Sequence, residues 1–218
     1  MALSDRPAER HNEIGRAFTD RVQGTHSWDV PSPVAEWTAR DVVRHLTDWF
    51  PPFLAGGSGI QLPAGPSVDD DPAGAWQTQF DAVQALLDDP ATADLLLSNP
   101  HIGEVPLDRA IDQFYTADVF MHTWDLARAT GQDDRLDPDF CAQLLAGMEP
   151  IEEIMRSSGQ YGARVPVKDD ADARTIGEAT RPKVVAAAHF RAPGGCLRIA
   201  LRERRGDGVG ARTGWRWR

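Results

Sequence analysis

Apolar side chains recur at intervals of three and four residues along much of the chain, the spacing that places them on one face of an α-helix. The pattern predicts five helices, which span Pro7–Val22, a segment beginning after Thr38, Pro72–Leu87, Leu107–Thr130 and Pro138–Arg156. The fourth is the longest, and its apolar residues cover much of its circumference. We therefore expect it to be the central helix of the fold.

Several residues mark where these helices begin and end. Thr38 can cap the second helix, and Asp41 completes a capping box in which Asp takes the usual place of Glu or Gln. The apolar stripe of the same helix is interrupted at the Pro51-Pro52 pair. Gly131 is expected to end the long fourth helix.

The connection at Gly56–Asp71 is long and rich in Gly, Pro and Asp. Its length is enough to carry the chain back along a bundle, so the second and third helices can run parallel instead of forming a tight hairpin. A second stretch, around Asn99-Pro100 and Gly103, is interpreted as irregular. The sequence therefore predicts an all-α fold, a four-helix bundle with long crossover connections and an extra C-terminal helix.

The composition is that of a globular protein, with 218 residues of which 41% are hydrophobic and 26% charged. No uncharged apolar stretch approaches the ~20 residues of a membrane span, and Met1–His11 lacks the apolar segment of a signal peptide. The net charge of −10 disfavours general binding to nucleic acids or anionic membranes. Cys141 and Cys196 are too few for a disulfide framework, so we expect two reduced thiols in a cytoplasmic protein, with a disulfide as the alternative.

Three side chains on two predicted helices form a candidate metal site. Asp118 and His122 are four residues apart, so they lie on one helix face about a turn apart. That face is otherwise apolar, and a carboxylate there is costly unless it is paired or binds a cation. His45 lies on the second helix, beside an apolar stripe. Two imidazoles and one carboxylate suit zinc, nickel or iron and leave positions open for water or substrate.

Simpler interpretations of the same residues stay open. Asp118 and His122 can form an ordinary hydrogen bond on a helix surface, and His45 can be a core histidine without a metal. The P-loop, H-E-x-x-H and C-x-x-C signatures are absent from the sequence. Gly56–Gly59 follows a helix and not a strand, so it predicts a flexible loop. Cys141 lies near a helix start, where its thiol pKa can fall, but no base can be assigned to it and we expect a core role. Four further histidines occur in polar or loop sequence and receive no role: His11, His26, His101 and His189.

Two segments resemble the signatures of a known family. Glu36–Leu46, which reads EWTARDVVRHL after a Pro-Ser-Pro tripeptide, is similar to the first signature of the mycothiol-dependent maleylpyruvate isomerase N-terminal domain family. Ala117–Gly131, which reads ADVFMHTWDLARATG, is similar to the second. This family belongs to the DinB-like metal-binding four-helix bundles. The resemblance implies that fold and implies His45, Asp118 and His122 as the metal ligands.

The chain departs from the family pattern in three ways. The isomerase has a glutamate where Asp118 stands, and Val34 occupies a position where relatives often have cysteine. The C-terminal α/β domain of the isomerase, which helps to bind its substrate, is not recognisable in this sequence. The resemblance therefore implies the fold and the metal, and not the isomerase activity itself.

The charge changes sign near the end of the sequence. Residues 176–218 sum to +7 and residues 1–175 to −17. We divide the chain into a DinB-like helical domain at 1–175 and a basic tail at 176–218 that is not a separate domain. Two interpretations of the tail stay open, a native segment that docks on the acidic body or on an acidic partner, and the product of a reading-frame change, since relatives end differently.

The leading functional hypothesis is an enzyme in which a metal lowers the pKa of a thiol or water and presents it to a small electrophile. The expected cofactors are a divalent metal, with zinc first and nickel or iron as alternatives, and a mycothiol-like thiol. Isomerase or transferase chemistry would follow. Asp125 is expected either to accept an imidazole N–H behind the metal, or to pair with Arg128 or take part in a capping interaction.

A non-catalytic metal-binding or ligand-binding module with a regulatory role is the alternative hypothesis. An open metal position facing a pocket favours catalysis, whereas a fourth protein ligand favours a structural role. The expected partners are a small-molecule substrate or thiol cofactor, without nucleic acid or membrane. The chain is expected to be a monomer or a homodimer.

Overall fold

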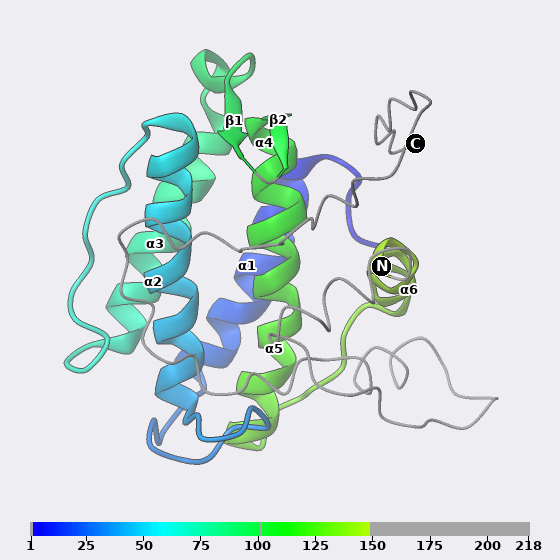
Figure 1. The fold of residues 1–218 in the computed structure, drawn as a ribbon. Coiled ribbons are helices and arrows are strands. Elements are labelled where there is room, and N and C mark those ends of the chain that lie inside the picture. Colours follow the sequence, from blue (N-terminus) through cyan, green and yellow to red (C-terminus); the bar gives the residue numbers. More distant parts are fainter. Residues whose placement is uncertain (1, 101, 149–218) are drawn as a thin grey trace, which may run out of the picture.

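The computed structural model of the chain describes residues 2–100 and 102–148 and shows a mainly α-helical fold (Figure 1). The helices are α1 (Pro7–Gln23), α2 (Ala39–Ser58), α3 (Pro72–Asp88), α4 (Leu107–Ala110), α5 (Ala117–Thr130) and α6 (Pro138–Met148), with a 3-10 turn at Pro90–Thr92. The prediction of a mainly helical chain is confirmed. The end of the predicted fifth helix and the tail at 176–218 lie outside the described residues.

The helices α2 and α3 run in the same direction, as the long connection between them predicts (Figure 1). Near their N-terminal ends, the Arg40 guanidinium donates to the carbonyl of Val68 at 3.1 Å. Near their C-terminal ends, Gly57 of α2 faces the side chain of Leu97, which follows α3 in the chain. The segment between the two helices therefore crosses the whole length of the bundle.

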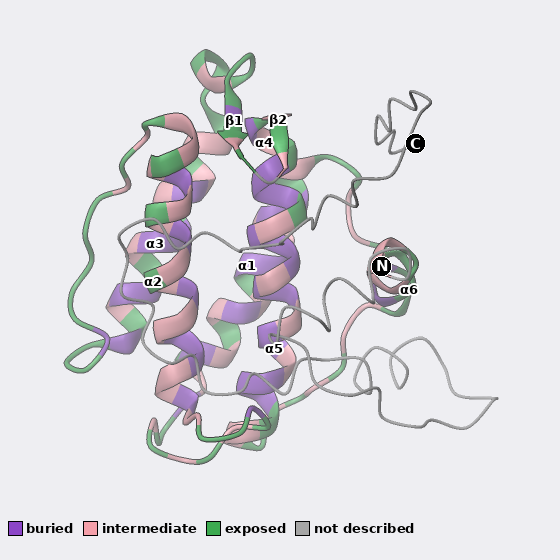
Figure 2. Cartoon of the chain, viewed as in Figure 1, coloured by how far each residue is buried: buried purple, intermediate pink, exposed green. Residues whose placement is uncertain are grey.

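The core lies between α1, α2, α3 and α5, whose buried residues face inward (Figure 2). Large aromatic rings fill it. Phe18 of α1 lies 4.4 Å from Trp76 of α3, and Phe50 of α2 stacks on Tyr115 at 4.1 Å, both measured between ring centroids. Such contacts stabilise beyond the area that they bury. They hold α1 against α3, and α2 against the segment that leads into α5.

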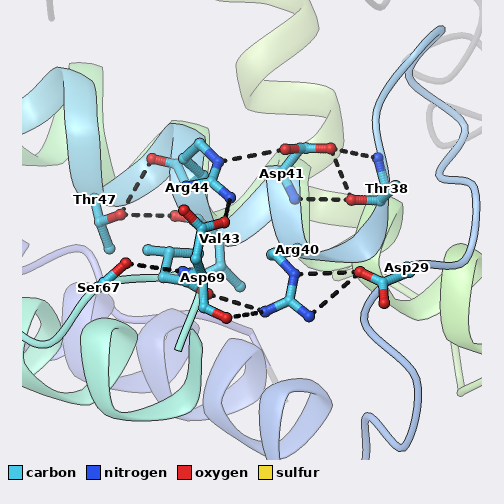
Figure 3. A network of polar contacts seen from close by, with 10 residues as sticks. Asp29, Thr38, Arg40, Asp41, Val43, Arg44, Thr47, Ser67 and Asp69 are labelled. Atoms are coloured by element: carbon cyan, nitrogen blue, oxygen red, sulfur yellow. Dashed lines mark hydrogen bonds and ion pairs between the residues drawn. The ribbon is translucent and has the colours of Figure 1, made fainter. Parts of the chain in front are cut away.

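The N-terminal end of α2 is held by a network of polar contacts (Figure 3). Thr38 and Asp41 form the predicted capping box, in which each side chain accepts from the other residue's backbone N–H. Arg44 binds Asp69 of the crossover segment at 2.6 Å, and Arg40 contacts Asp29 at 3.3 Å. His45 directly follows Arg44 along α2. The network therefore also holds the part of α2 that carries His45.

The Pro51-Pro52 pair, which interrupts the apolar stripe, lies inside α2 and does not end it. The helix continues to Ser58 and ends at Gly59, whose φ of 76° lies in the left-handed region that glycine adopts without strain. The predicted flexible segment Gly56–Gly59 is thus the last turn of a helix and its cap.

The long fourth helix of the sequence prediction is continuous but changes its winding. A π-helical segment, Ile111–Thr116, joins α4 to α5. A π turn holds one residue more than an α turn, so it rotates the following side chains by about 100° relative to the preceding ones. Gly131 ends α5 with a φ of 70°, as predicted.

The stretch around Asn99-Pro100 is not wholly irregular, which corrects the sequence interpretation. It forms an antiparallel hairpin of β1 (Leu96–Asn99) and β2 (Gly103–Pro106), which projects at the end of the bundle (Figure 1). Only Leu97 of β1 is fully buried. Each strand is too short for alternating apolar residues to reveal it.

Among the described residues, no helix combines the length and apolar character that crossing a membrane requires. Cys141 is buried near the start of α6, which agrees with the expected core role. His11 was expected in a polar setting, but it is 1% exposed and lies between Phe80 and Tyr115. Its position on the inward face of α1 explains the difference.

Candidate metal centre

His45, Asp118 and His122 converge at one place between α2 and α5. One ligand atom from each of the three side chains lies within 4.8 Å of the others. The two imidazole rings meet edge to face, with centroids 4.8 Å apart. The sequence prediction therefore names three residues that the fold brings together, although His45 and Asp118 are 73 positions apart in the chain.

The carboxylate of Asp118 is the centre of the group. Its Oδ2 atom lies 3.0 Å from Nε2 of His45 and accepts a hydrogen bond from Nε1 of Trp49 at 2.9 Å. Its Oδ1 atom lies 3.4 Å from Nε2 of His122. Burial alone would raise the pKa of the Asp118 carboxyl, but the two histidines and Trp49 outweigh it and hold that pKa below its usual value.

Asp125 lies behind His122, on the side away from Asp118. Its Oδ2 atom is 2.8 Å from Nδ1 of His122, and both side chains are buried. Arg128, the alternative partner considered for Asp125, instead contacts Asp134 at 3.2 Å. Of the two residues, His122 is the one that the structure places against the Asp125 carboxylate.

Trp37 is a part of the site that the sequence analysis did not identify. Its ring centroid lies 5.1 Å from that of His45 and 5.8 Å from that of His122, on which it stacks. The backbone of the preceding Glu36 has a φ of 66°, a conformation that is uncommon outside glycine. The loop closes on itself through a hydrogen bond from the Ser32 N–H to the Trp37 carbonyl at 2.8 Å. This turn directs Trp37 toward both imidazoles.

Trp49 is a second part of the site that the sequence analysis does not identify. The signal was present in the sequence, since a residue four positions after His45 lies on the same helix face. An indole N–H is a donor without acceptor capacity, so it matches the carboxylate that it meets.

The donor set fits a divalent transition metal. Two imidazole nitrogens and one carboxylate oxygen are the ligand types of zinc and of neighbouring metals in the series. The side chains of His45, Asp118 and His122 are 30%, 18% and 8% exposed, so the group sits at the edge of the core. A set of this kind, with one side toward solvent, can bind an ion and still leave room for a further ligand.

By its fold and its site, this is a mainly helical protein with a candidate metal site that two helices build. Two curated proteins of Mycobacterium tuberculosis, from strains CDC 1551 / Oshkosh and ATCC 25618 / H37Rv, are each 32% identical to the chain over 128 residues. Both are described as uncharacterized. The match covers 56% of this chain and 64% of each relative, less than two thirds of their length. No family model and no solved structure matches the chain.

Proposed function

We propose that this protein is a metal-dependent enzyme in which His45, Asp118 and His122 bind one divalent cation, zinc in preference to nickel or iron. The observation that supports the proposal is the convergence of the three side chains, whose ligand atoms lie within 4.8 Å of one another. Their hydrogen-bonded surroundings support it further, because ligating imidazoles and carboxylates are usually oriented by such partners.

We assign the fold to the DinB-like four-helix bundles and the chain to the mycothiol-dependent maleylpyruvate isomerase N-terminal domain family. The parallel α2 and α3 and the long connection between them support this assignment. The resemblance of Glu36–Leu46 and Ala117–Gly131 to the family signatures points to the same three residues that the geometry brings together. Two independent arguments therefore select one site.

The proposed chemistry is nucleophilic attack on a small electrophile, in an isomerase or transferase reaction. A bound divalent ion supplies a lowered pKa to a thiol, such as a mycothiol-like cofactor, or to water. The residues of the chain would hold the ion and orient its ligands. Asp125 accepts the Nδ1–H of His122 and so keeps Nε2 unprotonated for ligation, while Trp37 covers one side of both imidazoles.

Metal analysis of the purified full-length chain tests the proposal. After dialysis against zinc and removal of free ion, mass spectrometry should find about one zinc per chain. His122→Ala should lose it, since two remaining ligands rarely retain a divalent ion against water. His26→Ala is the matched control, because His26 is exposed and outside the site. A zinc-free wild type, or full zinc content in His122→Ala, would contradict the site.

Cobalt substitution distinguishes an enzyme from a closed metal site. If the metal keeps a position for an external ligand, addition of a small thiol should produce a thiolate-to-cobalt absorption band. A cobalt spectrum that no thiol changes would contradict the proposed thiol chemistry.

A further inference from the structure

The Trp49 indole donates a hydrogen bond to the Asp118 carboxylate, at the same oxygen that lies 3.0 Å from Nε2 of His45. It lies one helical turn after His45 on α2, so both side chains reach the same carboxylate from the same helix. The indole Nε1 donates to Oδ2 at 2.9 Å, whereas Oδ1 faces His122. The two oxygens of Asp118 therefore have different surroundings.

The orientation of the indole is fixed by its neighbours. The ring centroid of Trp49 lies 5.5 Å from that of Phe50, 5.7 Å from that of Phe53 and 6.0 Å from that of Tyr115. A ring packed on three sides loses little freedom when its N–H binds. In addition, the indole N–H stays protonated at every pH at which the protein is folded. Oδ2 therefore keeps this donor whatever the protonation of the histidines.

We propose that Trp49 is a positioning residue that makes Asp118 bind the metal through one oxygen. The inference rests on the proposed function, since it concerns the same metal. A carboxylate can bind a metal through one oxygen or through both. The Trp49 N–H occupies a lone pair of Oδ2 and fixes the carboxylate plane, which leaves Oδ1 the less engaged oxygen.

The consequence concerns the number of positions left on the metal. If Asp118 bound through both oxygens, it would take one more coordination position. With two imidazoles and one oxygen, the ion keeps a position for an external thiol or water in the four-coordinate geometry that zinc prefers. Trp49 thus acts on ligand exchange at the metal without contacting the external ligand.

Trp49→Phe tests this in the cobalt-loaded full-length chain, because it removes the N–H and keeps an aromatic ring. We expect cobalt affinity to fall about 10-fold, which is the low end for loss of a partner behind a metal ligand. We also expect weaker visible absorption by the bound cobalt, because its intensity decreases when a second Asp118 oxygen raises the coordination number. Binding of 2-mercaptoethanol to the cobalt should weaken by about 10-fold.

Trp76→Phe is the matched control. The Trp76 indole also donates a hydrogen bond, to Thr19 Oγ1 at 2.8 Å, but on the far side of the core between α1 and α3. This variant loses the same kind of contact and should leave the cobalt spectrum and the thiol affinity at wild-type values.

The outcomes separate the inference from the proposed function. If wild type binds cobalt and Trp49→Phe matches it in absorption and thiol affinity, the inference is wrong and the metal site stands. If wild type binds no cobalt, both are wrong. X-ray absorption of the zinc-loaded wild type gives a second measurement that needs no variant, and two Asp118 oxygens at the metal would overturn the inference.

Discussion

The carboxylate of Asp125 lies 2.8 Å from Nδ1 of His122, one turn further along α5. A carboxylate only accepts hydrogen bonds, so Nδ1 must carry the proton of this contact. The lone pair of the neutral imidazole then resides on Nε2, the nitrogen that faces Asp118. Asp125 thereby sets the tautomer of His122 as well as its orientation.

Asp125→Asn should lower the affinity for zinc by about 10-fold or more, within the range found for such partners. An amide can donate to Nδ1 and so favour the tautomer in which Nε2 carries the proton and cannot bind a metal. Competition with a chromogenic chelator measures the affinity. Asp81→Asn on α3, where the exposed carboxylate accepts a hydrogen bond from Gln77, should leave the zinc affinity unchanged. Equal affinities in the two variants would contradict the role of Asp125.

His11 should make the stability depend on pH. Burial lowers its pKa from 6.5 to about 4, an effect that nearby Asp88 only partly offsets. Between these values the unfolded chain binds more protons than the folded one, so the free energy of unfolding decreases as pH falls from 6.5 to 4. Over this whole range the free energy of unfolding should fall by about 3 kcal/mol.

Urea unfolding at several pH values measures this dependence. His11→Phe should flatten the curve between pH 4 and 6.5, because the titrating group is gone while an aromatic ring remains between Phe80 and Tyr115. Substitution of the exposed His26 should not flatten it. A wild-type curve that is already flat in this range would show that His11 is not buried as a neutral group.

Replacing two helical glycines by alanine should change the free energy of unfolding in opposite directions. A methyl group at Gly15 of α1 would overlap the ring of Phe80, which is itself stacked on Trp76. Gly15→Ala should destabilise by about 1–3 kcal/mol through overpacking. At Gly56 of α2 nothing lies within 4 Å of the added carbon, so Gly56→Ala should stabilise by up to about 1 kcal/mol. Thermal unfolding of both variants checks the signs.

The ion pair between Arg10 and Asp112 should be costly to break. Its atoms are 2.8 Å apart, and the two side chains are 10% and 8% exposed. Burial raises the pKa of Asp112, although Arg10 opposes that change. Asp112→Asn should destabilise by about 3–5 kcal/mol, because it removes the buried counter-charge of the guanidinium and leaves it the exposed carboxylate of Asp5, at 3.4 Å.

The surface pair of Arg6 and Glu9 provides the comparison for Asp112. It is 2.7 Å long but largely exposed, so Glu9→Gln should change stability by less than about 1 kcal/mol. Denaturant unfolding of both variants gives the two values. If Asp112→Asn lowers the free energy of unfolding as little as Glu9→Gln does, Arg10 reaches solvent in the folded protein.

Truncation after Thr175 should leave a folded domain. The apolar stripes of the sequence and the described core all lie before this residue. Cooperative thermal unfolding and a retained α-helical circular dichroism spectrum are the expected results. Loss of the cooperative transition would show that the tail belongs to the core, and it would exclude a reading-frame product.

The sequence predicted the helices well where apolar spacing is sustained over several turns. The capping box of Thr38 and Asp41 placed the start of α2 correctly, and the length of the segment after it indicated that α2 and α3 run parallel. Two of the three candidate metal ligands could also be predicted together, because a four-residue spacing places Asp118 and His122 on one helix face by geometry alone.

Other features depend on contacts that no local pattern contains. Trp37 meets the imidazoles because a loop residue adopts a positive φ, and nothing in the identity of Glu36 signals that conformation. The hairpin strands are four residues each, too short for a period to emerge. The continuation of α2 past Pro51-Pro52 reflects packing of buried Phe50 and Leu54, which outweighs the local effect of proline.

The π-helical segment Ile111–Thr116 has a consequence for how the chain tolerates insertions and deletions. Such changes are normally confined to loops, but this helix contains a place where one residue can be removed while the winding stays regular. Deletion there would convert the segment to α-helix and turn α4 and the hairpin by about 100° relative to α5. The π-helical segment therefore sets the rotational register of α4 and the hairpin relative to Asp118 and His122, which face His45.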